Sequence, residues 1–145
     1  MRLNQVLQSK PDHVVILSPK ASVSQASALM MTERVGAILV CEGGRILGIL
    51  SERDLAVAIS VRGTELFGLR IGELMSVEVP TAAPGDAVID VMRMMTEKRA
   101  RHVPVVDGES VVGMVSIGDV LKSRLAEKIQ ENAVLQDLAR AHIPS

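Results

Sequence analysis

The chain has 145 residues, 48% of them hydrophobic, which suffices for one ordinary domain or for two small motifs that share a core. Its 16 basic and 17 acidic residues leave a net charge of -1, so no overall field favours nucleic acid or an anionic membrane. Phe67 is the single aromatic residue, and single-stranded nucleic acid therefore finds no stacking platform. We expect neither a nucleic-acid nor a membrane partner, and any anion site has to be local.

The cysteine content and the length of the apolar runs indicate the cellular compartment of the protein. Cys41 is the single cysteine, which excludes an intramolecular disulfide and suits a reducing environment. No apolar run approaches the roughly 18 residues of a membrane helix, and the N-terminal residues lack the apolar stretch of a signal peptide. We therefore expect a cytoplasmic protein.

The sequence contains one unit written twice. A shift of 65 residues aligns residues 14–54 with residues 79–119 without a gap, and ten of the 41 pairs are identical. Composition alone would give about two or three identities, so the repeat is real. The identical residues of the first copy are Val14, Pro19, Val23, Met30, Arg34, Val40, Gly43, Gly48, Ser51 and Asp54, and each recurs 65 positions later.

The first copy predicts a strand, a helix, a hairpin and a second helix, in that order. A β-rich run at 14–17 is closed by a Pro turn, and Val23, Ala26 and Met30 then lie on one helical face. Strands at 37–41 and 45–50 flank the Gly-rich connection at 42–44. The second helix begins at about Ser51.

Residues 62–72 connect the copies, and the second copy repeats the pattern. A strand is expected at 77–82, and a helix buries Val88, Val91, Met92 and Met95, spaced i, i+3, i+4 and i+7. A hairpin turns at 107–109, and a helix begins at about Ser116. Residues 126–143 form a further amphipathic pattern, which fits either a solvated tail or a helix that docks on a partner or caps a dimer.

These elements predict an α/β (α+β) fold of two β-α-β-β-α repeats, packed sheet against sheet with pseudo-two-fold symmetry, and a C-terminal helix. The expected divisions are a first repeat with the N-terminal segment (1–62), a connection (63–76), a second repeat (77–128) and a helical tail (129–145). Helical faces rich in Met, Val and Ala are more than one chain can cover, so we expect a homodimer.

Each copy ends in the same pattern at a strand-to-helix junction. Residues 48–54 (GILSERD) and 113–119 (GMVSIGD) both read Gly, two apolar residues, Ser, two variable residues and Asp. Ser at a helix N-cap with an acid three residues later forms a capping box, which alone explains both residues. The same geometry also suits a ligand, because the helix N-terminus attracts phosphate and a carboxylate accepts from ribose hydroxyls. Two such junctions, each preceded by a glycine, favour the ligand interpretation.

The paired motifs resemble the signature of tandem cystathionine-β-synthase (CBS) domains, also called a Bateman module. The resemblance covers both copies and includes the stretch RHVPVVD at 101–107, although the first copy lacks the proline at its corresponding stretch, 37–42. The motifs are similar to those of small bacterial proteins made of two CBS domains and little else.

The resemblance implies a cleft between the copies that holds up to two nucleotides, such as AMP, ADP, ATP, NAD or S-adenosylmethionine. In such domains the motif Asp holds the ribose, the motif Ser meets phosphate or ribose, and the base rests against the first strand. Carried over to this chain, the nucleotide-binding residues are Ile16, Leu17, Thr81 and Ala82 at the base, Ser51, Asp54, Ser116 and Asp119 at the ribose, and Arg53, Arg101, His102, Val103, Pro104 and Ile117 in the flanking motif positions.

The basic residues of the second copy predict that the site of Ser116 and Asp119 holds a phosphate more tightly than the site of Ser51 and Asp54. Arg101 and His102 precede a strand of that copy, so we expect them to hold a phosphate beside Ser116 and Asp119, with packing as the alternative role. Arg53 could reach across the cleft to the same phosphate. We assign no role to His13 and His142.

No zinc-protease, C-x-x-C, P-loop or dinucleotide motif occurs, so we expect no metal site and no catalysis. The expected function is an adenine-nucleotide sensor that reports to an unidentified regulated protein. Two alternatives stay open. One is a hydrolase that acts on a nucleotide in the cleft, and the other is a ligand-free dimerisation scaffold whose motifs are only helix caps.

Overall fold

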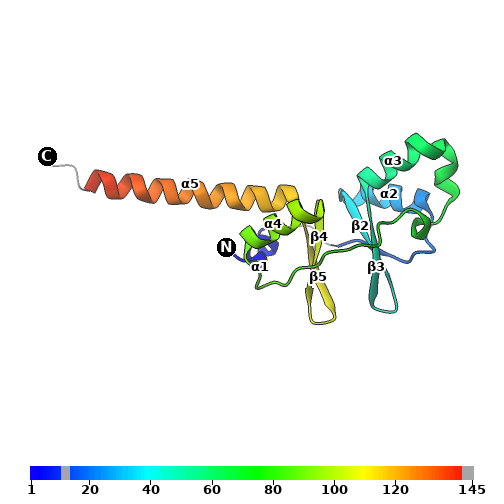
Figure 1. Cartoon of the computed structure of the whole chain (residues 1–145), viewed down its shortest axis with the longest axis horizontal. Coiled ribbons are helices and arrows are strands. Elements are labelled where there is room, and N and C mark those ends of the chain that lie inside the picture. The colour runs from blue at the N-terminus through cyan, green and yellow to red at the C-terminus, as the bar shows by residue number, and fades with distance from the viewer. Residues whose placement is uncertain (11–13, 142–145) are drawn as a thin grey trace.

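The computed structural model describes residues 1–10 and 14–141. The first copy contains β1 (Ile16–Leu17), α2 (Val23–Glu33), β2 (Ala37–Glu42), β3 (Arg45–Ser51) and α3 (Glu52–Arg62). The second contains α4 (Val88–Lys98), β4 (His102–Asp107), β5 (Ser110–Ser116) and α5 (Ile117–Ala141). Helix α1 (Leu3–Gln8) precedes the first copy, and two 3-10 helices, η1 (Gly63–Gly68) and η2 (Ile71–Glu73), connect the copies. The predicted α/β class with two repeats and a C-terminal helix is confirmed (Figure 1).

The two hairpins are built alike. Strand β2 pairs antiparallel with β3 and parallel with β1, and β4 pairs antiparallel with β5. The turn between β2 and β3 consists of Gly43 and Gly44, whose φ angles of 59° and 76° favour residues without a Cβ. The register shifts between Val40 and Cys41 in one hairpin and at the corresponding place in the other. The repeat is therefore structural down to the position of the bulge.

The first strand of each copy is shorter than predicted. The strand expected at 14–17 consists of Ile16 and Leu17. The strand expected at 77–82 is absent, and Ala82 alone forms a parallel bridge with Val105. Pro80 lacks an N–H donor, and a proline in this segment limits the ladder that the backbone can form.

The buried side chains form two clusters, one per copy, instead of one core shared between two packed sheets. The predicted helical faces are confirmed, because Val23, Ala26 and Met30 of α2 are buried in one cluster. In α4, Val88, Val91 and Met95 are buried in the other, with Met92 partly buried against it.

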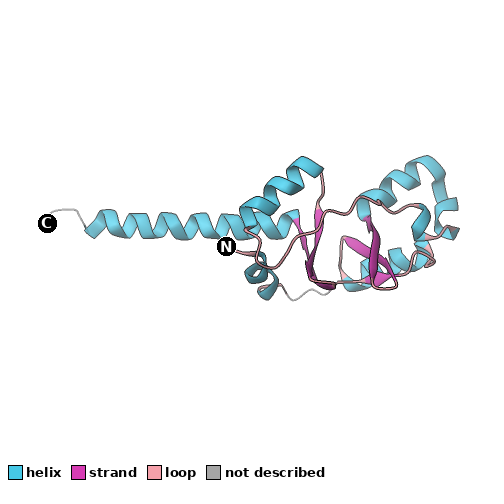
Figure 2. Cartoon of the chain, turned by 60° about the horizontal axis from the view of Figure 1, so that its bottom comes forward, coloured by secondary structure: helices cyan, strands magenta, loops and turns pink. Residues whose placement is uncertain are grey.

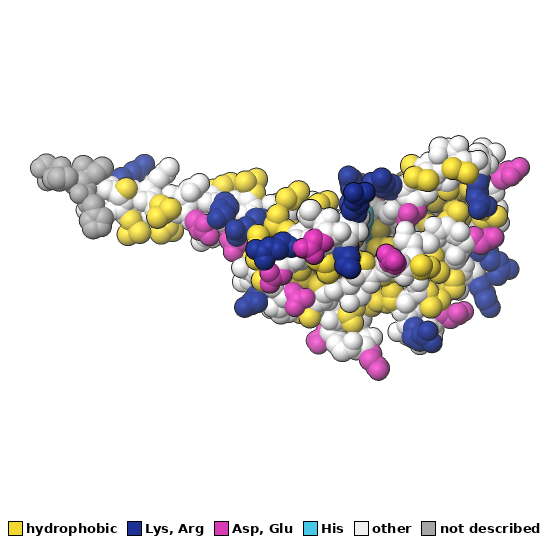
Figure 3. All heavy atoms as spheres, in the orientation of Figure 1, with side chains coloured by type: hydrophobic (Ala, Val, Ile, Leu, Met, Phe, Trp, Pro, Cys, Tyr) yellow, Lys and Arg dark blue, Asp and Glu magenta, His cyan; other side chains and the backbone are white. Residues whose placement is uncertain are grey.

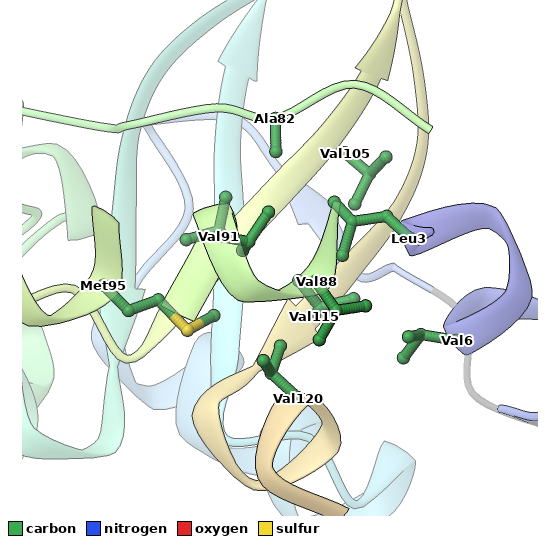
Figure 4. Close-up of a cluster of buried hydrophobic side chains, with 10 residues drawn as sticks. Leu3, Val6, Ala82, Val88, Val91, Met95, Val105, Val115 and Val120 are labelled. Carbon is green, nitrogen blue, oxygen red and sulfur yellow. The ribbon is translucent and has the colours of Figure 1, made fainter. Parts of the chain in front are cut away.

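Each cluster is completed by the segment that precedes the other copy along the chain. Leu3 and Val6 of α1 point into the second copy's cluster, as Figure 4 shows. Leu66 and Ile71, from the connection, are buried in the first copy's cluster. The backbone bonds match: Leu3 N donates to Asp86 O (3.0 Å), and Ile71 N donates to Ala21 O (2.9 Å). The copies therefore exchange their leading segments and form one unit.

The two halves lie side by side with their strands toward each other and their helices outside (Figures 1 and 2). Helix α5 projects away from this body. The helix predicted for residues 126–143 is continuous with the helix that begins after Ser116, because no Gly or Pro interrupts residues 119–141. Residues 142–145, the end of the predicted tail, lie outside the described residues. None of the described helices combines the length and apolarity that crossing a bilayer requires.

Gly48 provides a test of this packing. A Cβ on Gly48 would lie 2.5 Å from Met75 Sδ and 2.8 Å from the Ser76 carbonyl oxygen, and Ser76 is fixed by two backbone bonds to Ile49. We predict that Gly48→Ala lowers the free energy of unfolding by about 1–3 kcal/mol in urea titrations. Gly68→Ala is the control, because nothing lies within 4 Å of its added Cβ. Equal stability of the two variants would contradict the packing described.

Candidate functional site

Both motifs form capping boxes at the start of a helix. In the first copy, Asp54 Oδ2 accepts from Ser51 N (2.8 Å) and Ser51 Oγ (3.0 Å), and Asp54 N donates to Ser51 Oγ (3.2 Å). In the second, Asp119 Oδ2 accepts from Ser116 N (2.8 Å), and Asp119 N donates to Ser116 Oγ (3.1 Å). Each carboxylate is thus held in one orientation beside a positive helix end.

Two clefts lie beside these carboxylates, and each draws residues from both copies. We call them the Asp54 cleft and the Asp119 cleft. Residues of the Asp54 cleft include Gly36, Ile49, Ser51, Glu52, Arg53, Asp54, Ser76, Glu78, Val79, Pro80, Lys98, Arg99, Ala100, Arg101 and His102. Residues of the Asp119 cleft include Leu7, Lys10, Val14, Val15, Arg34, Val35, Gly36, Ala37, His102, Val112, Gly113, Met114, Ser116 and Asp119.

Basic side chains gather at the Asp54 cleft. They are Arg53 from α3, Lys98 and Arg99 from the end of α4, and Arg101, all exposed. None of these four forms an ion pair within 4.0 Å in the described part of the chain. Figure 3 shows Lys and Arg side chains crowded over the notch between the two halves. The Asp54 cleft therefore offers an anion several unpaired donors.

Arg99 and its counterpart Arg34 share an unusual backbone conformation. They end α4 and α2 with φ angles of 52° and 54°, in the left-handed region where glycine is the usual residue. Arg99 lines the Asp54 cleft and Arg34 the Asp119 cleft. The left-handed turn thus places one guanidinium-bearing residue at each cleft.

Arg101 lies in a different cleft from the one predicted. Its backbone carbonyl accepts from Ile117 N (2.8 Å), at the start of the helix that carries Asp119, but the residue lines the Asp54 cleft. The expectation that Arg101 stands beside Ser116 and Asp119 is therefore wrong. The two copies face each other, and the end of one copy's helix lies at the motif of the other.

His102 lines both clefts and lies over Gly36, where an added Cβ would come within 3.1 Å of His102 Nε2. Burial lowers the pKa of His102 below its ordinary value. The charges of Glu52 and Asp119 oppose this shift, whereas those of Lys10 and Arg101 add to it. The imidazole is therefore neutral near pH 7 and stands where both clefts meet.

The predicted residues divide into two groups. Ser51, Arg53, Asp54 and Arg101 line the Asp54 cleft, Ser116 and Asp119 line the other, and His102 lines both. Neither cleft is lined by the remaining predicted residues: Ile16, Leu17, Thr81, Ala82, Val103, Pro104 and Ile117. Of these, Ala82, Val103 and Pro104 are buried, and Ile16, Thr81 and Ile117 are exposed elsewhere. The nucleotide-binding role of each residue stays a prediction.

Sequence reasoning missed several cleft residues. The apolar walls come from Val14 and Val15 in one cleft and from Val79 and Pro80 in the other, two residues before the positions predicted for the base. The 65-residue shift pairs Val14 with Val79 and Val15 with Pro80, and this correspondence could have indicated that they line equivalent clefts. Lys10 carries no such signal, because it lies outside the repeat. His13 and His142 lie outside the described residues.

Comparison with known proteins identifies the family. The CBS domain model matches residues 9–61 and 71–126. This chain belongs to the CBS-domain family. The CBS domain-containing protein YhcV of Bacillus subtilis is 28% identical over 132 residues, which cover 91% of this chain and 94% of YhcV. The resemblance inferred from the two motifs is therefore confirmed.

Two solved CBS structures show the same arrangement. A CBS-domain-containing protein from Agrobacterium tumefaciens matches with a TM-score of 0.80 and 31% identity, covering 86% of this chain and 99% of that one. The CBS domain pair of protein MJ0100, in complex with 5′-methylthioadenosine and S-adenosyl-L-methionine, matches with a TM-score of 0.73 and 26% identity. That match covers 88% of this chain and 97% of that pair.

The lowered pKa of His102 predicts a pH dependence of stability. Between the folded-state pKa and the ordinary value of 6.5, the unfolded chain binds a proton that the folded chain does not. The free energy of unfolding should therefore fall as the pH drops below about 6.5, and His102→Gln should flatten this part of the profile in urea titrations. The pKa of Asp119 is also lowered, but this affects the free energy of unfolding only at pH values below its ordinary pKa of 3.8. An unchanged slope in the variant would contradict the prediction.

Proposed function

We propose that this CBS pair is a non-catalytic sensor that binds an adenine nucleotide of the AMP, ADP, ATP or NAD class in the Asp54 cleft. One observation carries the proposal. The cleft combines a carboxylate oriented at a helix N-terminus with four cations that have no ion-pair partner in the described residues. Those two features suit the two polar parts of a nucleotide, its ribose diol and its phosphate.

The ribose and the base would meet different surfaces. Asp54 Oδ2 is engaged in the capping box, while Oδ1 accepts a longer bond from Ser76 Oγ (3.3 Å). A carboxylate so oriented can accept from ribose hydroxyls. Val79, Pro80 and Ile49 line the same cleft and offer an apolar surface to a base. The chain has one aromatic residue, so aliphatic side chains would have to provide this contact.

The charge of the cleft favours a phosphate-bearing ligand. The related MJ0100 pair was solved with two adenosine-containing ligands, which supports an adenosine moiety here. The cleft lining also contains the carboxylates of Glu52, Asp54 and Glu78, but its four basic side chains outnumber them. A phosphate would gain charge-assisted bonds from these basic side chains, which the sulfonium cation of S-adenosylmethionine would not. The basic residues therefore favour a nucleotide over a sulfonium ligand.

The two alternative functions have less support. A hydrolase would use a placed base or a metal. The described residues contain no group of three His, Cys, Asp or Glu that could hold a metal ion, and one oxygen of Asp54 is already engaged in the capping box. A ligand-free scaffold would explain the capping boxes but gives no reason for unpaired cations around one of them. A sensor accounts for both.

The sensor is proposed to work as a homodimer and to report to a regulated protein. Val57 and Val61 on α3 and Met31 on α2 are exposed apolar side chains that a second copy could cover. We propose a cytoplasmic location with it, because the single Cys41 is a free thiol, which suits a reducing compartment.

The ribose contact is tested at Asp54. Asp54→Ala should weaken AMP binding in calorimetry about 10- to 100-fold, equivalent to about 1.5–3 kcal/mol for hydrogen bonds to a charged group. Asp107→Ala, which removes an exposed carboxylate at the end of β4, is the control and should bind AMP normally. An unchanged dissociation constant, with only a lower melting temperature, would show that Asp54 is merely a helix cap.

The phosphate contact is tested at Arg101. Arg101→Ala should weaken AMP binding about five- to tenfold and leave adenosine binding unchanged, because only AMP presents an anion to the exposed guanidinium. Added salt should likewise weaken AMP binding more than adenosine binding. Arg93→Ala, an exposed arginine paired with Asp90 on α4, controls for loss of charge. Equal losses for AMP and adenosine would show that Arg101 supports only the fold.

A further inference from the structure

Lys10 occupies the position beside Asp119 that a ligand would need. Its Nζ donates to Asp119 Oδ2 (2.7 Å) and to the Met114 carbonyl oxygen (2.7 Å). The side chains of Lys10 and Asp119 are 17% and 25% exposed, so the pair is largely shielded from water. A charge-assisted bond in such a place is stronger than a neutral one.

Among the described residues, no ammonium is bonded to Asp54 as Lys10 is to Asp119. The segments that cross between the copies correspond, because Arg2 N donates to Gln5 Oε1 (2.8 Å) as Arg70 N donates to Glu73 Oε2 (2.9 Å). After the α1 segment the chain supplies Lys10 to Asp119. After the η2 segment it supplies Ser76, whose hydroxyl makes a longer bond of 3.3 Å to Asp54. One motif carboxylate therefore faces a cation of its own chain and the other a neutral hydroxyl.

The two clefts also differ in size. The Asp119 cleft has a volume of about 270 Å³, and the Asp54 cleft of about 830 Å³. Sites for small molecules usually have about 300–1,000 Å³. The Asp54 cleft lies well within this range, whereas the Asp119 cleft, with Lys10 in its wall, lies just below it.

We propose that Lys10 acts as an internal occupant of the Asp119 cleft, so that the Asp54 cleft fills first and the Asp119 cleft accepts a nucleotide only when the Lys10–Asp119 pair opens. This inference rests on the proposed nucleotide-binding function. The apparent affinity of the Asp119 cleft for a nucleotide is its intrinsic affinity multiplied by the fraction of molecules in which the pair is open. The sensor therefore has one site for low nucleotide concentrations and a second site that responds at higher ones.

Calorimetry with AMP on the full chain tests the order of filling. The wild type should show one tighter site per chain and a second at least tenfold weaker. Lys10→Met keeps the aliphatic stem and removes the charge, and it should strengthen the second site at least tenfold while the first stays within twofold. Lys10→Arg retains a cation and should resemble the wild type. Lys128→Met, an exposed lysine on α5, controls for loss of charge.

Second substitutions assign each site. The site strengthened in Lys10→Met should disappear with Asp119→Ala and persist with Asp54→Ala. If Lys10→Met does not fold, Asp54→Ala in the wild-type background still decides, because it should leave only the weaker site. Two equal sites in the wild type, or no change in Lys10→Met, would overturn the role of Lys10 but not the nucleotide function. No AMP binding by any of these proteins would instead refute the proposed function.

Discussion

Neither copy of the repeat closes its own hydrophobic core. Leu3 and Val6 fill the core of the second copy, and Leu66 and Ile71 fill the core of the first. Because each of these segments belongs in sequence to the copy opposite, burying their side chains holds the two copies together. The clefts follow from this exchange, since the motif helix of one copy then faces the end of α2 or α4 of the other. Weakening the exchange would expose apolar surface and separate the walls of both clefts at once.

The exchange also makes two similar sites different. The repeat supplies a capping-box carboxylate, a left-handed arginine and an apolar wall to each cleft. The crossing segments lie outside the aligned repeat. One of them brings Lys10 to Asp119, and the other brings Ser76 to Asp54. In the proposed sensor, the difference between the two sites would thus come from residues that the symmetry of the repeat does not constrain.

His102 links the two clefts physically. It lines both of them and lies against Gly36, and its pKa is lowered by burial while charges from both clefts act on it. A phosphate bound in either cleft would favour the protonated imidazole and so alter the field in the other. The pKa of Asp119 is also lowered, because hydrogen bonds from Lys10 and Ser116 outweigh the opposing effect of burial. Among the residues that line the two clefts, His102 is the one whose side chain both of them share.

The sequence by itself determined the repeat, the order of most elements, the buried faces of α2 and α4, and the two capping-box motifs, because these depend on local periodicity and short-range hydrogen bonds. It also identified the family. Only the tertiary structure decided that the leading segments cross, that Arg101 lines the Asp54 cleft and that Lys10 reaches Asp119. A 65-residue repeat is visible in one dimension, but which copy a segment packs on depends on contacts between residues as distant as Lys10 and Asp119. Such contacts leave no periodic trace in a single chain.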